Sequence, residues 1–205
     1  MAVKLTKNEQ KKQKDALKQF QRYLPTLQLK KQQLQSVIRQ IETEIEGYKM
    51  EQERLIHSLQ SWIAVYNENT VFATEDKDIS SLVKIDKIVK GTGNIAGVQI
   101  PIFEDLTFED IDYDLNEYPL WVDRGVSALK DCARFDAIVK TLQTQIDLLS
   151  DELRTTSQRV NLFEKVKIPE AKENIRVIGI YLGDQQTAAV VRGKIAKKKI
   201  ERVAE

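Results

Sequence analysis

The chain contains few residues whose types and spacing support bond chemistry. His57 is its one histidine and Cys132 its one cysteine, which excludes a metal site built on several histidines and an internal disulfide. In the heptad pattern set out below, His57 falls on an outer position and Cys132 on an inner one. This predicts a solvated histidine and a buried cysteine that packs as a small apolar residue, not as a nucleophile. We therefore expect no catalytic residues, no metal site and no cofactor.

Two further segments invite a chemical interpretation. The run Gly91-Thr92-Gly93-Asn94-Ile95-Ala96-Gly97 is similar to a dinucleotide-binding fingerprint, but it has one residue too many before the last glycine and opens no helix. Residues 104–117 contain seven acidic and no basic side chains, but they lack the ligand spacing of a calcium loop. A solvated acidic loop or a partner-facing patch is the better interpretation of this stretch.

The amino-acid composition indicates that the fold consists mainly of long helices, which would carry the functional surfaces. The 205 residues include 32 basic and 31 acidic ones, with a net charge of +1, which argues against a globally basic nucleic-acid binder. Only 8 glycines and 4 prolines occur, few for a fold rich in loops. No apolar run approaches the roughly 18–20 residues of a membrane-spanning helix.

The N-terminal part follows a coiled-coil pattern, with an inner position every three or four residues. The inner positions are Leu17, Phe20, Leu24, Leu27, Lys31, Leu34, Ile38, Ile41, Ile45, Tyr48, Gln52, Leu55, Leu59, Trp62 and Tyr66. A repeat that lasts for seven heptads exceeds what an ordinary amphipathic helix shows. We therefore predict one helix over about residues 7–68, roughly 90 Å long.

A second heptad pattern runs through the C-terminal part. Its inner positions are Trp121, Gly125, Ala128, Cys132, Phe135, Val139, Leu142, Ile146, Leu149, Leu153, Thr156, Val160 and Phe163, and after Pro169 the frame shifts to Ala171, Ile175, Ile178 and Leu182. We predict a helix over about residues 119–200 that pairs antiparallel with the first one. Leu34, Ile41, Leu142 and Leu149 should lie in the shared seam.

Between the helices the period changes from helical to alternating. Val83 alternates with Ile85, and Val98, Ile100 and Ile102 alternate with their neighbours, which predicts a β-hairpin over about residues 82–103 with its turn at residues 91–94. Pro101 indicates an edge strand. The predicted fold is thus all-α, a long antiparallel two-helix coiled coil with a small β-hairpin inserted. Its three parts are residues 1–70, 71–118 and 119–205.

Lysines gather at both ends of the chain, in the first 18 and the last 14 residues. In an antiparallel pair these two clusters should meet at one end. Two interpretations follow from the charge alone: an arm that binds nucleic-acid phosphates, or a tip that enters an acidic protein surface. A third possibility is a coiled coil that serves as a scaffold.

Three stretches of sequence resemble the D subunit of V-type and A-type ATPases. Arg159-Val160-Asn161-Leu162-Phe163-Glu164 followed by Ile168-Pro169 is similar to that family's C-terminal motif. Asn94-Ile95-Ala96-Gly97-Val98 followed by Ile100-Pro101 is similar to its central hairpin, and Lys4-Leu5-Thr6-Lys7 to its N-terminus. The resemblance covers nearly the whole chain.

The resemblance implies a non-catalytic rotor shaft that couples ATP hydrolysis or synthesis to ion transport. It implies a place in the cytoplasm, peripheral to the membrane, with no membrane span and no nucleic acid. The implied partners are a ring of catalytic A and regulatory B subunits, the F subunit on the stalk, and the C subunit, which links to the membrane rotor ring. The residues expected at these interfaces are Lys4, Lys7, Lys11, Arg159, Asn161, Glu164, Lys194, Lys197, Lys198 and Lys199.

Overall fold

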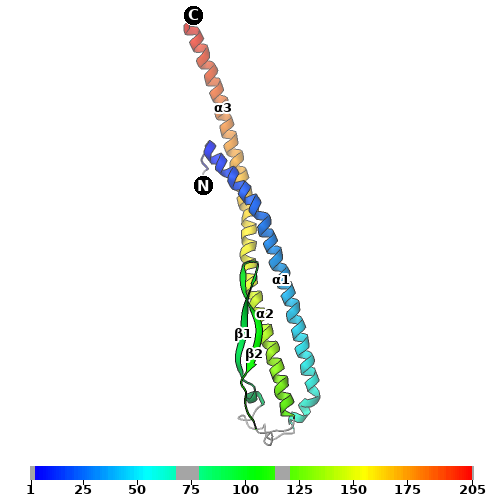
Figure 1. Ribbon diagram of the computed structural model, residues 1–205. Coiled ribbons are helices and arrows are strands. Elements are labelled where there is room, and N and C mark those ends of the chain that lie inside the picture. The colour runs from blue at the N-terminus through cyan, green and yellow to red at the C-terminus, as the bar shows by residue number, and fades with distance from the viewer. Residues whose placement is uncertain (1–2, 68–78, 114–120, 205) are drawn as a thin grey trace. The chain divides into compact units, whose positions relative to one another are not determined.

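The computed structural model describes residues 3–67, 79–113 and 121–204, and the side chains of these except 61–67 and 203–204. In chain order it has helix α1 (Lys7–Asn67), a 3₁₀ turn (Ile79–Leu82), strands β1 (Ile85–Ile95) and β2 (Val98–Phe108), helix α2 (Val122–Leu162), a π-helical turn (Phe163–Lys167) and helix α3 (Ile168–Ala204) (Figure 1). The prediction of a helical fold with an inserted hairpin is confirmed. The inner positions Trp62 and Tyr66, and the acidic residues of 114–117, lie outside the described side chains.

The chain forms two compact units, which are described separately. One comprises Gln32–Leu153, and the other comprises Met1–Lys31 with Arg154–Glu205. The larger one contains the hairpin and the part of each long helix that lies nearest to it in sequence.

In the unit of residues 32–153, α1 and α2 pack antiparallel around an aliphatic core. Its buried members are Leu34, Ile38, Ile41, Ile45, Ile100 and Leu149, with Leu142 packed against them. The Gln52 amide donates a 2.8 Å hydrogen bond to Asp136, and the rings of Tyr48 and Phe135 lie 6.3 Å apart. The predicted seam of Leu34, Ile41, Leu142 and Leu149 is confirmed, because heptad spacing brings the same face of each helix inward.

The β-hairpin is longer than predicted and turns at a different place. Ile95 pairs with Val98, and the two residues between them have positive φ angles, 51° at Ala96 and 84° at Gly97. Both angles suit the tight two-residue turn that matches strand twist. The Asn94 side chain also accepts a 3.0 Å hydrogen bond from the Gly97 amide. The predicted turn at residues 91–94 is therefore wrong, since those residues belong to β1.

The glycines of that misplaced turn have a packing role within β1. A Cβ atom on Gly91 would meet the carboxylate of Glu104, and one on Gly93 would lie 2.7 Å from the Ile102 Cδ1 atom. Side chains of β2 thus lie across the bare backbone of β1. Glycine is used here for close approach, not for backbone freedom, and the sequence offered no signal that distinguished these two uses.

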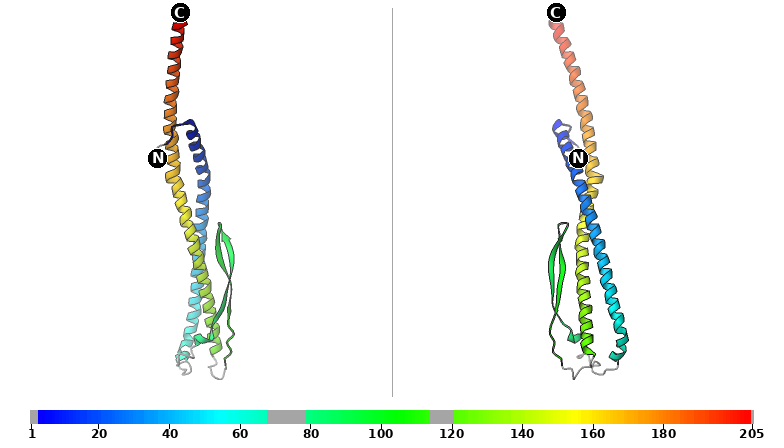
Figure 2. Two further views of the ribbon diagram at one scale, coloured as in Figure 1. Left: turned by 90° about the vertical axis from the view of Figure 1, so that its left-hand side faces the viewer. Right: turned by 45° about the vertical axis from the view of Figure 1, so that its right-hand side comes forward.

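The hairpin lies along α2 (Figure 2). Ile100 is 4% and Leu106 2% exposed, and the Gln145 amide donates a 2.5 Å hydrogen bond to the Pro101 carbonyl. Nearer the hairpin base, Leu82, Val122 and Val126 form a second buried cluster. A two-stranded hairpin is marginal by itself, so this packing on α2 is what stabilises it.

In the other unit, the first turns of α1 pack antiparallel on the end of α2 and on α3. Val160, Ala171 and Ile178 are buried, the rings of Phe20 and Phe163 lie 5.3 Å apart, and the Asn174 amide is 3.5 Å from Gln13 Oε1. Thr6 begins α1 by accepting a 3.2 Å hydrogen bond from the Glu9 amide, which satisfies one of the unpaired donors at the helix start.

A π-helical turn, not a continuous α-helix, connects α2 to α3. The Ile168 amide bonds to the Phe163 carbonyl, five residues back. Pro169 follows directly, and a proline in a helix has no N–H and crowds the carbonyl four residues earlier. The wider turn relieves that conflict, and its extra residue accounts for the frame shift that the heptads show at this point. The predicted long C-terminal helix is confirmed, with this π-helical turn within it.

Candidate partner-binding surfaces

The two basic clusters do not meet, although they lie in the same unit. Gly179 of α3 is next to Gln10 of α1, 3.4 Å from the side chain when a Cβ is placed on the glycine. Exposed Lys4, Lys7 and Lys11 are therefore level with the middle of α3. Exposed Lys194, Lys197, Lys198 and Lys199 lie a further 15 to 20 residues along α3. At 1.5 Å per residue, the offset along the helix axis runs from roughly 14 Å between Lys4 and Lys194 to roughly 32 Å between Lys11 and Lys199.

The second half of α3 extends beyond the beginning of α1, as Figures 1 and 2 show. We call residues 183–204 the α3 overhang. Every described side chain from Gly183 to Arg202 is exposed except that of Ala188. The prediction that the two clusters form one tip is wrong, because the beginning of α1 meets the middle of α3 and heptads do not fix where two helices meet.

Exposed apolar side chains accompany the lysines of the α3 overhang. Val190, Val191, Ile195 and Ile200 are 59%, 50%, 51% and 69% exposed. Together these four aliphatic residues give this part of the helix an exposed apolar surface. Sequence reasoning missed them because it treated the weakening heptad as the end of the seam. The signal was the presence of Val190–Val191, Ile195 and Ile200 at intervals of four and five residues around the lysines.

The Arg159-to-Pro169 motif divides into packed and exposed residues. Val160 is buried and Phe163 contacts Phe20, whereas Arg159, Asn161 and Glu164 are exposed. Next to them, Leu162 and Val166 are 46% and 49% exposed. The polar members of the motif thus do not stabilise the helix pair, and they are available to a partner.

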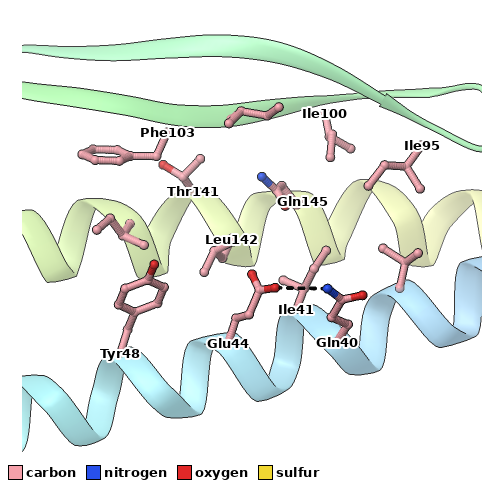
Figure 3. Close-up of a pocket in the computed structure, with 13 residues that line it drawn as sticks. Gln40, Ile41, Glu44, Tyr48, Ile95, Ile100, Phe103, Thr141, Leu142 and Gln145 are labelled. Carbon is pink, nitrogen blue, oxygen red and sulfur yellow. Dashed lines mark hydrogen bonds between the residues drawn. The ribbon is translucent and has the colours of Figure 1, made fainter.

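A cavity of about 410 Å³ lies between the hairpin, α1 and α2 (Figure 3). Ile41, Ile100 and Leu142 contribute apolar walls. Tyr48 and Glu44 of α1 contribute the polar side, where the Gln40 amide is 3.4 Å from the Glu44 carboxylate. Thr141 of α2 also lines it, but its hydroxyl donates to the Ala137 carbonyl of its own helix.

The structure confirms the sequence interpretation of His57 and only part of that of Cys132. His57 is exposed, as predicted, and Cys132 is half-buried, less than predicted. Burial raises the pKa of the Cys132 thiol, with smaller contributions from the charges of Asp136 and Asp131. A raised pKa lowers the thiolate fraction, which is the opposite of nucleophile activation. Within the described residues, no group of three potential ligands is placed to hold a metal, and no helix is long and apolar enough to cross a membrane.

Comparison with known proteins decides the family. Residues 9–198 match the family of the ATP synthase D subunit. The chain belongs to that family. A V-type ATP synthase D subunit from Borreliella burgdorferi is 54% identical over 198 residues, covering 97% of this chain and 95% of the relative. One from Chlamydia pneumoniae is 34% identical over 201 residues, covering 97% and 93%. These names give no support to a nucleic-acid arm or a free scaffold.

Proposed function

We propose that the chain is the central-stalk rotor subunit of a V-type ATPase or ATP synthase, in which rotation couples ATP turnover to ion transport. The observation that carries the proposal is the α3 overhang, a lone helix with four lysines at 194 and 197–199 among exposed aliphatic side chains. Family membership supplies the context. The chain itself contributes no bond chemistry to this function, and the complex would hold it peripheral to the membrane on the cytoplasmic side.

The α3 overhang suits entry into the cavity of a ring of A and B subunits. Lysine charges attract acidic walls over a Debye length of about 8–10 Å, and this attraction varies smoothly as the shaft turns. Small aliphatic contacts are non-directional, so they add affinity without fixing one angle. Lys4, Lys7 and Lys11 would face the same ring at a lower level.

We assign the two other partners to the remaining exposed surfaces. The F subunit would bind along the stalk at the surface of Arg159, Asn161 and Glu164, with Leu162 and Val166 as the apolar centre. The C subunit, which links to the membrane rotor ring, would engage the unit of residues 32–153 near the beginning of α2. The exposed character of the motif residues supports the first assignment, and the family context supports the second.

The test uses a reconstituted complex with altered α3 overhangs. Changing Lys194, Lys197, Lys198 and Lys199 together to Gln should weaken assembly or torque several-fold at low salt, and less so at high salt, where the wild type is screened too. A chain ending at Leu182 removes the overhang but leaves the contact of Gln10 with Gly179, and it should lose more. The matched control changes the same number of exposed lysines elsewhere, namely Lys49, Lys87, Lys140 and Lys172.

The outcomes distinguish a rotor subunit from an arm that binds nucleic acid. Loss of coupling in the two α3-overhang variants, with normal coupling in the control variant, supports the rotor function. Unchanged assembly and coupling in both α3-overhang variants, together with tight binding of the purified chain to RNA or DNA at low salt, refutes the rotor function.

A further inference from the structure

The π-helical turn between α2 and α3 leaves a backbone acceptor open. A helix carbonyl accepts the N–H four residues later in an α-helix and five residues later in a π-helix. The Glu164 carbonyl would thus need the N–H of Ile168 or of residue 169. The Ile168 amide is bonded to the Phe163 carbonyl, and Pro169 has no N–H. The Glu164 carbonyl therefore has neither of the donors that its own helix could supply.

The carbonyl of the next residue is in a similar position. The α-helical donor for the Lys165 carbonyl would be residue 169, which is Pro169 and has no N–H. The turn has no buried residue, and the side chains of Glu164, Lys165 and Val166 are exposed. Two successive carbonyls without α-helical donors thus lie at the protein surface, where another molecule can bind them.

The charge of the turn favours a cationic donor. An unsatisfied helix carbonyl has a partial negative charge, which is the origin of the negative end of a helix. Glu164 adds its carboxylate, which forms no ion pair or hydrogen bond with another side chain that the structure describes. The neighbouring Lys167 ammonium lies 3.6 Å from the Glu170 carboxylate and forms an ion pair with it.

Apolar side chains accompany these acceptors. Leu162 and Val166, four residues apart, are 46% and 49% exposed. A protein that packs on them would exclude water from the turn, and a hydrogen bond is stronger in less polar surroundings. Arginine is enriched in protein interfaces, and its guanidinium has five N–H donors in a planar fork. One arginine side chain can therefore donate to more than one acceptor of this turn.

We propose that the F subunit recognises the π-helical turn by placing an arginine on the open carbonyls of Glu164 and Lys165. The Glu164 carboxylate adds to the attraction, and Leu162 and Val166 receive apolar side chains of the same partner. Pro169 keeps the acceptors open, because it provides no N–H to close them. This inference rests on the F subunit binding at this surface, as proposed above. A hydrogen bond from a charged donor is stronger than one from a neutral donor such as water, so the open carbonyls add affinity.

Pro169→Ala tests the proposal because it supplies the missing N–H. The new amide can bond to the Lys165 carbonyl four residues back or to the Glu164 carbonyl five residues back, and either bond closes one acceptor. Alanine is also more favourable than proline within a helix. The full-length variant should therefore melt at a higher temperature than the wild type, yet bind the purified F subunit roughly 10-fold more weakly by titration calorimetry. A purely structural role would not move stability and affinity in opposite directions.

Two further variants separate recognition from stability and test the charge. Pro25→Ala is the matched control, because Pro25 lies inside α1 and is exposed. It should raise the melting temperature and leave the affinity for the F subunit unchanged. Glu164→Gln should weaken binding several-fold at low salt and less at high salt, since salt screens the lost attraction.

The affinities for the F subunit give distinct outcomes. Equal affinity of the wild type and Pro169→Ala overturns the role of the open carbonyls and leaves the rotor function standing. Equal weakening by Pro25→Ala and Pro169→Ala overturns it too, because the loss would then follow from stiffer helices. Unchanged affinity of Glu164→Gln at low salt overturns the cationic donor. No binding of the F subunit to the wild type refutes the assignment of that subunit to this surface, and this inference with it.

Discussion

Leu149 offers the sharpest test of the helix pairing. Its side chain is 0% exposed among Leu34, Ile38 and Ile41, whereas its neighbour Leu148 is 40% exposed. Leu149→Ala removes roughly three carbon groups from the core at about 0.8 kcal/mol each, and the cavity left behind brings the total to about 3–4 kcal/mol. Leu148→Ala, the same chemical change one residue away, should cost about 1 kcal/mol or less.

Urea unfolding followed by circular dichroism at 222 nm measures both variants. For a chain of this size the Leu149 variant should also melt about 10 °C lower, at roughly 2–4 °C per kcal/mol. Similar losses for the two variants would show that the α1–α2 seam does not run through Leu149. A large loss for Leu148→Ala alone would mean that α2 is rotated by about one residue relative to the structure.

Three further predictions concern local features. Ala96→Gly should stabilise the hairpin by up to about 1 kcal/mol, because φ at Ala96 is 51° and glycine tolerates that region, and urea unfolding would reveal it. Because the pKa of Cys132 is raised, iodoacetamide at pH 8 should alkylate Cys132 more slowly in the folded chain than in the unfolded chain. Asp136→Asn should reduce this difference in alkylation rate. Equal alkylation rates in the folded and unfolded chain would contradict the pKa shift. The 2.5 Å hydrogen bond from Tyr113 to Asp123, and secondarily burial, raises the Tyr113 pKa. The stabilising contribution of this hydrogen bond is present below pH 10 and is lost as the pH rises above that value. Tyr113→Phe should therefore make the free energy of unfolding less dependent on pH between pH 9 and 11.

The heptads were sufficient to predict the helices and their pairing. Thirteen of fifteen inner positions in the first pattern are apolar or aromatic, and a stripe of that length has few ways to be buried other than by a second stripe. Leu34 and Leu149 are therefore found where the pattern placed them. Periodicity also located the frame shift near Pro169, although it did not identify the π-helical turn that produces it.

The structural features that the sequence did not predict depend on contacts between segments far apart in sequence. Gly91 and Gly93 favour a turn by residue type, and their role emerges only when Glu104 and Ile102 are placed across the hairpin. The hydrogen bond from Gln145 to the Pro101 carbonyl joins residues 44 positions apart. The reach of α3 beyond α1 depends on where the two helices meet, which a heptad repeat leaves open by whole turns.

The α3 overhang has a thermodynamic consequence for any molecule that receives it. A helix of about 20 residues without a neighbour is marginal in water, and this one contains Gly183 and Gly193, each costing about 1 kcal/mol relative to alanine. Exposed pairs such as Lys197 with Glu201, 3.7 Å apart, return only about 0.3–0.5 kcal/mol. The overhang should therefore fray when free and become fully helical as it is covered, so that its insertion releases heat, loses conformational entropy and weakens on warming.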